Sequence, residues 1–397
     1  MSLEEIYRHE YGRILASLIR AVRDFTLAED ALQEAFVVAH TLWPSRGTPA
    51  NPGAWLLTTA RHKAIDHLRR RRMAGEKHFE MITLATADEL TPLPQDKLRL
   101  IFTCCHPSLA PEVQVALTLK TVCGLTTEEI ARAYVTPVAT IAQRIVRAKT
   151  KIKLAAIPYE VPADDALIER VEAALAVIYL VFNEGYSASA GPTLVRADLC
   201  DEAIRLGRDL VALMPAQREA RGLLALMLLI DARRATRTDA TGALVRLEDQ
   251  DRSRWDHARI VEGAALVESS LRDGPAGAYA IQAAIAAVHA QAPSWQDSDW
   301  KQILVLYSLL SRLQPSPIIE LNRVVALAMA EGPEKALPLL DRIELPGYHL
   351  LPAARAQLLR ELGRHSEAAE AYRAALRLVK TEPERRFLQL RLSEVTV

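Results

Sequence analysis

Apolar residues recur along this chain at the spacing of an amphipathic helix, and this periodicity restricts its fold more than any other feature. Leu, Ala, Arg and Glu, which all occur readily in helices, dominate the sequence. Long runs of alternating β-branched residues are missing, and residues 245–247 form the one stretch with a strand-like composition. We therefore expect an all-α protein.

Length and composition are those of a globular protein with more than one domain. The 397 residues are 50% hydrophobic and 25% charged, and at about 150 residues per domain they predict two or three domains. The uncharged apolar stretches are far shorter than the roughly 20 residues that a bilayer-spanning helix needs. The first ten residues contain three glutamates, unlike an export signal, so we expect a cytoplasmic protein without membrane contacts.

Breaks in the helical periodicity divide the chain into three helical units. The expected boundaries are 1–73 for the first unit, 74–95 for a linker, 96–157 for the second unit and 163–397 for the third. The linker contains Gly and Pro and loses the apolar spacing. The third unit opens with Asp164 and Asp165, which are typical of helix starts.

The first unit contains an internal loop. Its second helix is expected to open at Asp24 or Thr26 and to end before Pro44. Residues 44–53 contain three prolines and two glycines, which favours an ordered loop, and a further helix is expected over 54–72.

The end of the chain has the pattern of small and large residues found in a tetratricopeptide (TPR) helix pair. The pattern is clear over residues 353–376 and weaker over 327–343. By extension we expect the whole third unit to be a TPR-like α-solenoid.

Residues 120–153 carry the pattern of a helix-turn-helix. Thr126 and Glu129 have the spacing of a capping box for the first helix, and Pro137 can open the second. Four apolar residues at helical spacing are expected to hold the second helix to the core, namely Ile141, Ile145, Ala148 and Ile152.

The opposite face of this second helix is suited to DNA. A recognition helix needs side chains that reach base edges, a task that Gln143 and Arg147 can perform, and cations that contact phosphates. The available cations are Arg144, Lys149, Lys151 and Lys153. The alternative is a solvated basic helix with no function.

A second basic patch covers residues 61–72. It has six Lys or Arg residues and one acidic residue, and Ile65 and Leu68 are expected to anchor it. By itself, such a patch fits any polyanion or an exposed helix end equally well.

Three segments together resemble an extracytoplasmic-function (ECF) sigma factor of the sigma-70 family. Residues 28–39 have the D-x-x-Q-E-x-F spacing of the sigma helix that docks on the RNA polymerase clamp. Residues 55–70 and the helix-turn-helix are similar to further sigma segments. The resemblance covers about residues 5–155 and implies sigma region 2 in the first unit and sigma region 4 in the second.

The resemblance also implies a partner for each surface. Region 2 would bind core RNA polymerase and the melted −10 element, and region 4 would read the −35 duplex in its major groove. The implied polymerase-binding residues are Asp30, Gln33 and Glu34. The implied −10 residues are Arg46, Asn51, Arg61, His62, Lys63, Asp66, His67, Arg69 and Arg70. The implied −35 residues are Thr140, Ala142, Gln143, Arg144, Val146, Arg147, Lys149 and Lys151.

Some of these residues have a structural alternative. Asp30 and Glu34 could simply line a solvated helix face. Trp55 opens an apolar helix face, so we expect it in the core rather than as a stacking surface.

The third unit has no counterpart in an ordinary sigma factor. Its segments 179–186 and 247–256 resemble those of a sigma-factor subgroup in which a TPR-like extension tunes activity. The implied interface residues are Asn183, Glu184, Tyr186, Asp249, Asp251 and Arg252. Alternatively, Gly185 ends a helix as its C-cap, and the acidic residues near Arg252 form a metal or ligand site or, more in keeping with their type, a surface ion-pair cluster.

Other reactive residues indicate no chemistry. Cys104 and Cys105 are adjacent, and with Cys123 and Cys200 they lack the spacing of a zinc site, so we expect buried, reduced thiols and no metal or cofactor. Motifs of hydrolases, phosphate loops, dinucleotide sites and zinc proteases are missing, so we expect no enzyme.

The sequence therefore predicts an alternative sigma factor that binds core RNA polymerase, directs it to promoters and is modulated by its helical extension. The extension would bind the sigma half of the same chain or another protein. Rival predictions are a helix-turn-helix regulator that binds duplex DNA without polymerase, and a TPR adaptor whose sigma-like half is inactive.

Overall fold

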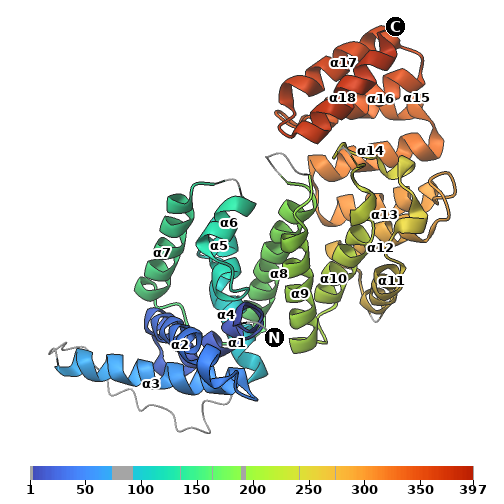
Figure 1. The fold of residues 1–397 in the computed structure, drawn as a ribbon. Helices are drawn as coiled ribbons and strands as arrows, with labels where there is room; N and C mark the ends of the chain where they lie inside the picture. The colour runs from blue at the N-terminus through green and yellow to red at the C-terminus, as the bar shows by residue number, and fades with distance from the viewer. Residues whose placement is uncertain are drawn as a thin grey trace. The chain divides into compact units, whose positions relative to one another are not determined.

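The structure is a computed structural model that describes residues 3–73, 93–134, 136–162, 164–188, 194–240, 242–272 and 274–396. Over these ranges the chain forms helices and turns with no β-strand, which confirms the all-α expectation (Figure 1). The helices group into two compact units, Met1–Leu180 and Val181–Val397. Within the described ranges, no helix has the length and apolar character that crossing a bilayer requires.

The first unit contains both parts that resemble sigma regions. Its helices are α1 (Leu3–Val22), α2 (Phe25–Arg46), α3 (Pro52–Met73), α4 (Pro94–Cys104), α5 (Pro111–Thr121), α6 (Thr127–Ala133), α7 (Val138–Leu154) and the larger part of α8 (Asp164–Tyr186). Most of the predicted linker, residues 74–92, lies outside the described residues. α8 begins at Asp164, as its helix-start residues predict.

Helix α1 is the centre of this unit. It packs on α2 and α3 and also on α4 and α5. Ile6, Ile14 and Leu18 recur at helical spacing and are fully buried. Burial of α1 therefore joins the two halves of the first unit in one core.

Helix starts follow their capping residues. The Asp24 carboxylate accepts a hydrogen bond from the Leu27 backbone N–H at 3.0 Å and so caps α2. The predicted capping box opens α6: the Thr126 N–H donates to Glu129 at 2.7 Å, and the Glu129 N–H donates to Thr126 at 3.1 Å.

The loop predicted over residues 44–53 is shorter than expected. α2 does not end before Pro44 but continues to Arg46, and α3 begins at Pro52. Pro44 lies in the last turn of α2, where the missing N–H removes one helical bond and the Gly47 N–H still donates to the Trp43 carbonyl at 2.9 Å. Pro52 takes the first helical position, where no N–H is needed.

The second unit is a succession of helices coloured from green to red in Figure 1. They are α9 (Ala197–Leu213), α10 (Arg218–Asp231), α11 (His257–Leu271), α12 (Ala278–Gln291), α13 (Trp300–Leu313), α14 (Pro317–Glu331), α15 (Pro333–Leu340), α16 (Leu350–Glu361), α17 (His365–Leu378) and α18 (Glu382–Val395). Short 3-10 turns, η2 (Arg234–Thr236), η3 (Leu247–Asp249) and η4 (Arg252–Arg254), connect α10 to α11.

Most contacts in this unit join helices that are close in the chain. α10 is buried between α9, α11 and α12, and from α12 onward each helix packs on the next. The predicted helix pair over residues 353–376 corresponds to α16 and α17, with Gly363 at φ 72° in the turn between them. The helical extension is thus confirmed.

Two local alternatives that the sequence left open in this unit do not form. Gly185 does not cap a helix end, because α8 continues through it to Tyr186. A Cβ at Gly185 would lie 2.7 Å from the Cys200 backbone nitrogen, so glycine is required where α8 and α9 approach closely. Residues 245–247 form no strand either: the bridge nearby pairs Thr238 with Leu244 alone, and η3 begins at Leu247.

Candidate nucleic-acid interface

Helix α7 is amphipathic in the predicted manner. Its four predicted core residues are 1% to 8% exposed, and they are Ile141, Ile145, Ala148 and Ile152. On the other side Gln143 and Arg147 are exposed, one helical turn apart, with Ala142 and Val146 exposed beside them. Such a face can present two polar side chains to neighbouring base edges.

The turn before α7 brings the helix-turn-helix together. The Thr136 N–H donates to the Ala131 carbonyl oxygen at 2.9 Å, and Pro137 is the residue immediately before α7 rather than its first residue. Val135 lies outside the described residues. α6 packs on α7, so the turn sets the angle between these two helices.

The predicted −35 residues of α7 that carry the remaining polar side chains differ in exposure and in the bonds that they form. Thr140 and Arg144 are half-buried, whereas Lys151 is exposed and donates to the Ser108 carbonyl oxygen. The Lys149 ammonium donates to the Glu29 carboxylate of α2. Lys149 is therefore paired inside the protein in this state.

Glu29 is a functional candidate that the sequence analysis missed. It is 4% exposed, and it also accepts a hydrogen bond from the Tyr11 hydroxyl at 3.3 Å. The Lys149 ammonium lies 5.7 Å from the centre of the Phe25 ring. The available signal was a glutamate among the apolar residues of α2, since a buried carboxylate needs a partner.

Three further tertiary contacts hold the first unit together. The Tyr159 hydroxyl donates to the Ala16 carbonyl oxygen at 2.8 Å and lies 3.1 Å from that of Asp96. Burial raises the pKa of Tyr159, which keeps its proton in place. On α8, Arg170 donates to the Phe102 carbonyl oxygen at 3.1 Å. None of these three tertiary contacts was predicted.

A cavity of about 720 Å³ lies along this junction. Its walls come from α1, α2, α4 and α7 and from the segment after α7. Cations dominate the polar part of the wall, which includes Arg20, Arg23, Arg99, Lys149 and Lys153. Buried Asp96 pairs with Arg20 at 2.8 Å and with Arg99 at 3.0 Å, which balances part of this charge.

The polymerase-binding residues predicted on α2 are only partly free. Asp30 and Gln33 are exposed. Glu34 lies 2.6 Å from the His67 Nε2 and 3.5 Å from the Lys63 ammonium, both on α3. The hydrogen bond from His67, followed by the charges of His67 and Lys63, holds the pKa of Glu34 below its usual value. One predicted polymerase contact thus also positions two predicted DNA contacts.

The other predicted −10 residues lie along α3 and the loop before it. Exposed side chains are those of Arg46, Asn51, His62, Asp66, Arg69 and Arg70, and Arg61 is half-buried. Asn51 accepts a hydrogen bond from the Ala54 N–H at 3.0 Å, so it caps α3 as well as facing solvent. Trp55 is half-buried and packs edge-on against Trp43, 5.4 Å between ring centres.

Where the described residues show ion pairs or hydrogen bonds of the predicted extension interface, these go to other residues and not from one predicted interface residue to another. Glu184 pairs with Arg196 at 2.7 Å, and Asn183 is exposed. Asp249 pairs with Arg246 at 3.1 Å, whereas Asp251 caps η4 by accepting from the Ser253 N–H at 3.0 Å. Tyr186 is buried against arginine side chains, and Arg252 bonds backbone carbonyls at the end of α12.

The four cysteines are buried and have free thiols. Cys104 lies 3.0 Å from the Thr121 hydroxyl, and burial raises the pKa of Cys105 to about 12. Within the described part of the chain, His, Cys, Asp and Glu form no group of three that could hold a metal ion.

Comparison with known proteins identifies the two halves of the first unit. Family models for sigma-70 region 2 and sigma-70 region 4 match residues 6–73 and 99–152. A model for a family of unknown function (DUF6596) matches residues 170–271. No solved structure matches.

Curated relatives include sigma factors. The chain is 32% identical over 164 residues to the RNA polymerase sigma-H factor of Pseudomonas aeruginosa, covering 38% of this chain and 83% of that protein. It is 26% identical over 147 residues to the ECF RNA polymerase sigma factor SigK of Mycobacterium ulcerans, covering 35% and 77%. An uncharacterized protein of Rhizobium meliloti is 42% identical over 392 residues, covering 96% and 93%.

Both sigma regions are matched at the helices that form the candidate interface described above. A curated sigma factor is also matched over most of its length. The chain therefore belongs to the extracytoplasmic-function sigma factors of the sigma-70 family.

Proposed function

We propose that this sigma factor binds core RNA polymerase and directs it to promoters whose −35 element is read by α7. The observation that carries the proposal is the exposed pair Gln143 and Arg147 above a fully buried stripe on α7. A helix held in this way presents a fixed set of side chains to the major groove. Thr140, Ala142, Arg144 and Val146 complete that surface, and Lys149 and Lys151 contact phosphates once their internal bonds open.

Region 2, which we place at residues 1–73, binds polymerase and the melted −10 strand. The exposed side chains of Asp30 and Gln33, with Glu34 beside them, are the polymerase contact on α2. The cations of α3 hold the single strand, because a basic groove follows a nucleic-acid backbone without needing paired bases. The linker is placed at residues 74–95 and region 4 at 96–157.

The extension, placed at residues 163–397, modulates this activity through contacts with the sigma half or with another protein. Asn183, Asp249 and Asp251 are its exposed interface candidates. The mechanism is binding and involves no catalytic residue. A protein with this role acts where core polymerase meets promoters, in the cytoplasm.

The test is run-off transcription with purified core polymerase and the full chain, on fragments recovered by genome-wide binding of the chain. We expect a discrete transcript that requires the chain, and coelution of the chain with core. The double variant Asp30→Ala, Gln33→Ala is expected to lose both. Glu112→Ala, an exposed carboxylate on α5, is the matched control and is expected to retain both.

The rival functions give different results. A helix-turn-helix regulator would bind duplex fragments without core and support no initiation. An adaptor with an inactive sigma half would bind neither core nor promoter DNA. Either result would overturn the proposed function.

A further inference from the structure

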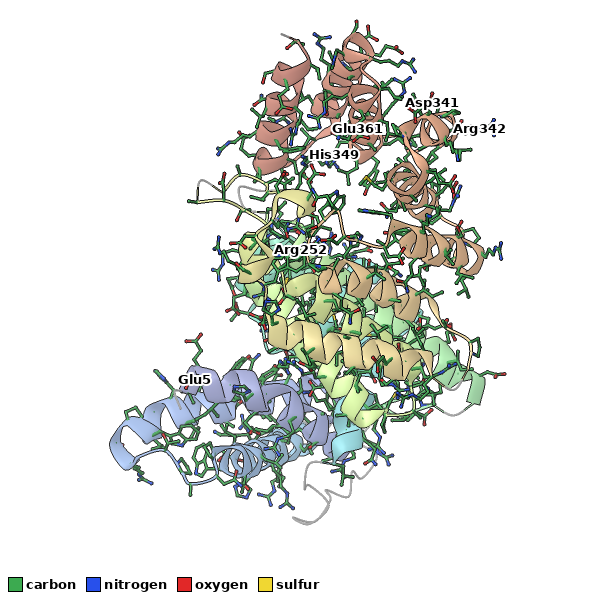
Figure 2. The ribbon with its side chains drawn as sticks, turned by 90° about the vertical axis from the view of Figure 1, so that its right-hand side faces the viewer. Glu5, Arg252, Asp341, Arg342, His349 and Glu361 are labelled. Atoms are coloured by element: carbon green, nitrogen blue, oxygen red, sulfur yellow. The ribbon has the colours of Figure 1, made fainter. Side chains whose placement is uncertain are left out.

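The second unit contains three arginines that lack carboxylate partners. Arg233 and Arg237 follow α10, and Arg252 lies in the yellow segment before α11 (Figure 2). Among the described residues, none of the three forms an ion pair within 4.0 Å. Their neighbour Arg234, by contrast, pairs with both Asp201 and Asp231 at 2.7 Å.

Longer-range carboxylates compensate only weakly. Asp297 acts on Arg252 and Glu384 acts on Arg237, each from beyond ion-pair distance. A Coulomb interaction weakens as the distance between two charges increases, and two such carboxylates do not match three arginines. The group of three arginines therefore keeps an excess of positive charge.

Aromatic rings hold these arginines in place. The Arg237 guanidinium carbon lies 3.8 Å from the centre of the Tyr186 ring and that of Arg233 lies 5.6 Å from it. The Arg252 guanidinium carbon lies 4.6 Å from the Trp255 ring centre. Stacking on a ring occupies the face of a guanidinium and leaves its N–H edges for hydrogen bonds.

Several of those N–H groups are unused. The buried Nε of Arg237 and the buried Nη2 of Arg252 have no hydrogen-bond acceptor in the parts of the chain that are described. The other terminal nitrogen of Arg252 donates to the Ala292 carbonyl oxygen at 2.8 Å and to that of His289, which fixes the side chain. Buried donors without acceptors are uncommon in folded proteins, and a ligand is one way to satisfy them.

A small cavity adjoins the group. It has a volume of about 40 Å³ and is lined by Arg233, Leu247, Trp255 and His289, with apolar residues of α10 and α12. A single water needs roughly 10–15 Å³ measured in this way, so the cavity has room for a group larger than one water. It is too small for a nucleoside.

His289 adds a polar but uncharged wall. Burial, and then the charges of Arg233 and Arg252, lower its pKa to about 4, so the ring is neutral near pH 7. Its Nδ1 is buried without a partner. Trp295 stacks on the ring with 5.8 Å between centres, which fixes its orientation.

We propose that the extension binds a small oxyanion, the carboxylate or phosphate group of a soluble metabolite, in the cavity lined by Arg233 and His289 beside Arg252. Guanidinium groups bind such anions through paired N–H donors. The anion would supply the missing negative charge, and it would give a hydrogen-bond partner to the buried Nδ1 of His289, which lines the cavity. This site lies outside the polymerase and DNA surfaces, so its test is separate from that of the proposed function.

The test is thermal unfolding of the full chain with inorganic phosphate or acetate as the probe, with sodium chloride keeping the ionic strength constant. We expect a saturable rise in Tm with at least one probe, because a ligand that binds only the folded state stabilises it. A rise with phosphate alone assigns a phosphate group, and a rise with acetate alone assigns a carboxylate. No rise above the chloride control would overturn the site.

Variants locate the binding. Arg233→Gln is expected to abolish the probe-dependent rise, while the Tm without probe stays equal or increases because one of three clustered positive charges is removed. Arg254→Gln, an exposed arginine of η4, is the matched control and is expected to keep the rise. If Arg233→Gln does not fold, His289→Asn provides the second test. We expect this variant to bind the probe with an apparent affinity at least about tenfold weaker. An unchanged response in the folded variants would overturn the proposal.

Discussion

At the scale of single residues, the exposed face of α7, which we propose reads DNA, is set by residues on the opposite, buried face. Ile141 and Ile145 fix the rotation of α7 about its axis, and this rotation decides that Gln143 and Arg147 are exposed. Base reading and phosphate contact are therefore separable by substitution.

Replacing Arg147 with Ala should alter the preference at one −35 position. We expect about 1–3 kcal/mol less discrimination between bases at that position. Lys151→Ala should instead weaken binding to all sequences alike, and it should reduce the salt dependence of the affinity by about one phosphate contact. Equilibrium binding of the sigma-polymerase complex to −35 variants at several salt concentrations measures both. A uniform loss for Arg147→Ala would contradict base reading.

Native thiols should be unreactive. Burial raises the pKa of Cys105 and of Cys200 to about 12, so the thiolate that reacts with alkylating agents is scarce at pH 8. A thiol with a raised pKa would gain thiolate only as the pH approaches that value. Intact-mass analysis after iodoacetamide treatment should show almost no labelling of the native chain and labelling of all four cysteines in denaturant. Rapid native labelling would show that a cysteine is accessible.

Sequence periodicity predicts the buried side of α7 but does not predict the contact that Lys149 makes. The buried stripe follows from local spacing, which the sequence contains directly. The partner of Lys149 is Glu29, 120 residues away, and no local pattern connects them. The sequence therefore predicts a DNA contact for Lys149 but cannot predict its bond to Glu29.

At the scale of helices, the contact between α2 and α7 has two competing uses for one ammonium group. The Glu29 carboxylate neutralises the Lys149 ammonium and holds it against α2, so the bond to Glu29 weakens the attraction of Lys149 for a DNA phosphate. Under the proposed function, we expect this contact to open when duplex DNA binds, which frees the Lys149 ammonium for a phosphate.

Replacing Glu29 with Gln should test this competition. We expect the free energy of unfolding to fall by about 1–3 kcal/mol, because the buried ion pair with Lys149 is lost, and nonspecific duplex affinity to rise because the charge of Lys149 is no longer neutralised. Guanidinium unfolding and filter binding measure the two effects. Glu112→Gln, exposed on α5, should change stability by less than about 0.5 kcal/mol. Lower stability with unchanged DNA affinity would exclude the competition.

Contact between α8 and α9 should be sensitive to one methyl group. Gly185→Ala places a Cβ against the Cys200 backbone, and we expect a loss of about 1–3 kcal/mol from overpacking. Gly207→Ala is the control, because its Cβ would meet the flexible end of Met227 and helix propensity favours Ala. Denaturant unfolding of both variants measures the difference. Equal stability of the two variants would contradict the close approach.

Gly185 and Pro44 both depart from their intrinsic preferences, and the departures have a common cause. The intrinsic preference of glycine allows a helix end at Gly185, and that of proline predicts one before Pro44. Tertiary packing overrides both: α9 needs the space at Gly185, and buried Trp43 packs against Trp55 at the end of α2. Single-residue preferences carry no information about such contacts.

At the scale of the whole molecule, breaks in periodicity and compact units divide the chain differently. The sequence predicts three helical units, whereas the contacts of α1 with both α3 and α4 place the first two in one compact unit. Sequence patterns locate helices well, but the grouping of helices depends on contacts between distant segments.

Unfolding of the full chain should therefore proceed in two steps. Residues 1–180 and 181–397 form separate compact units, and a chain of this kind rarely unfolds as one cooperative unit. We expect Glu29→Gln to shift one transition and Gly185→Ala to shift the other. Circular dichroism in a guanidinium series measures both, and a single transition shifted by both variants would contradict independent units.

The spacing of contacts along the chain bears on how the protein folds during its synthesis. The first unit is closed by contacts between residues 120 and 143 positions apart, so the junction of its two halves is complete only after Tyr159 has been made. Helices of the extension pair with near neighbours, and each pair can form as soon as its second helix leaves the ribosome. The half of the chain that is translated first is thus the half whose closure has to wait.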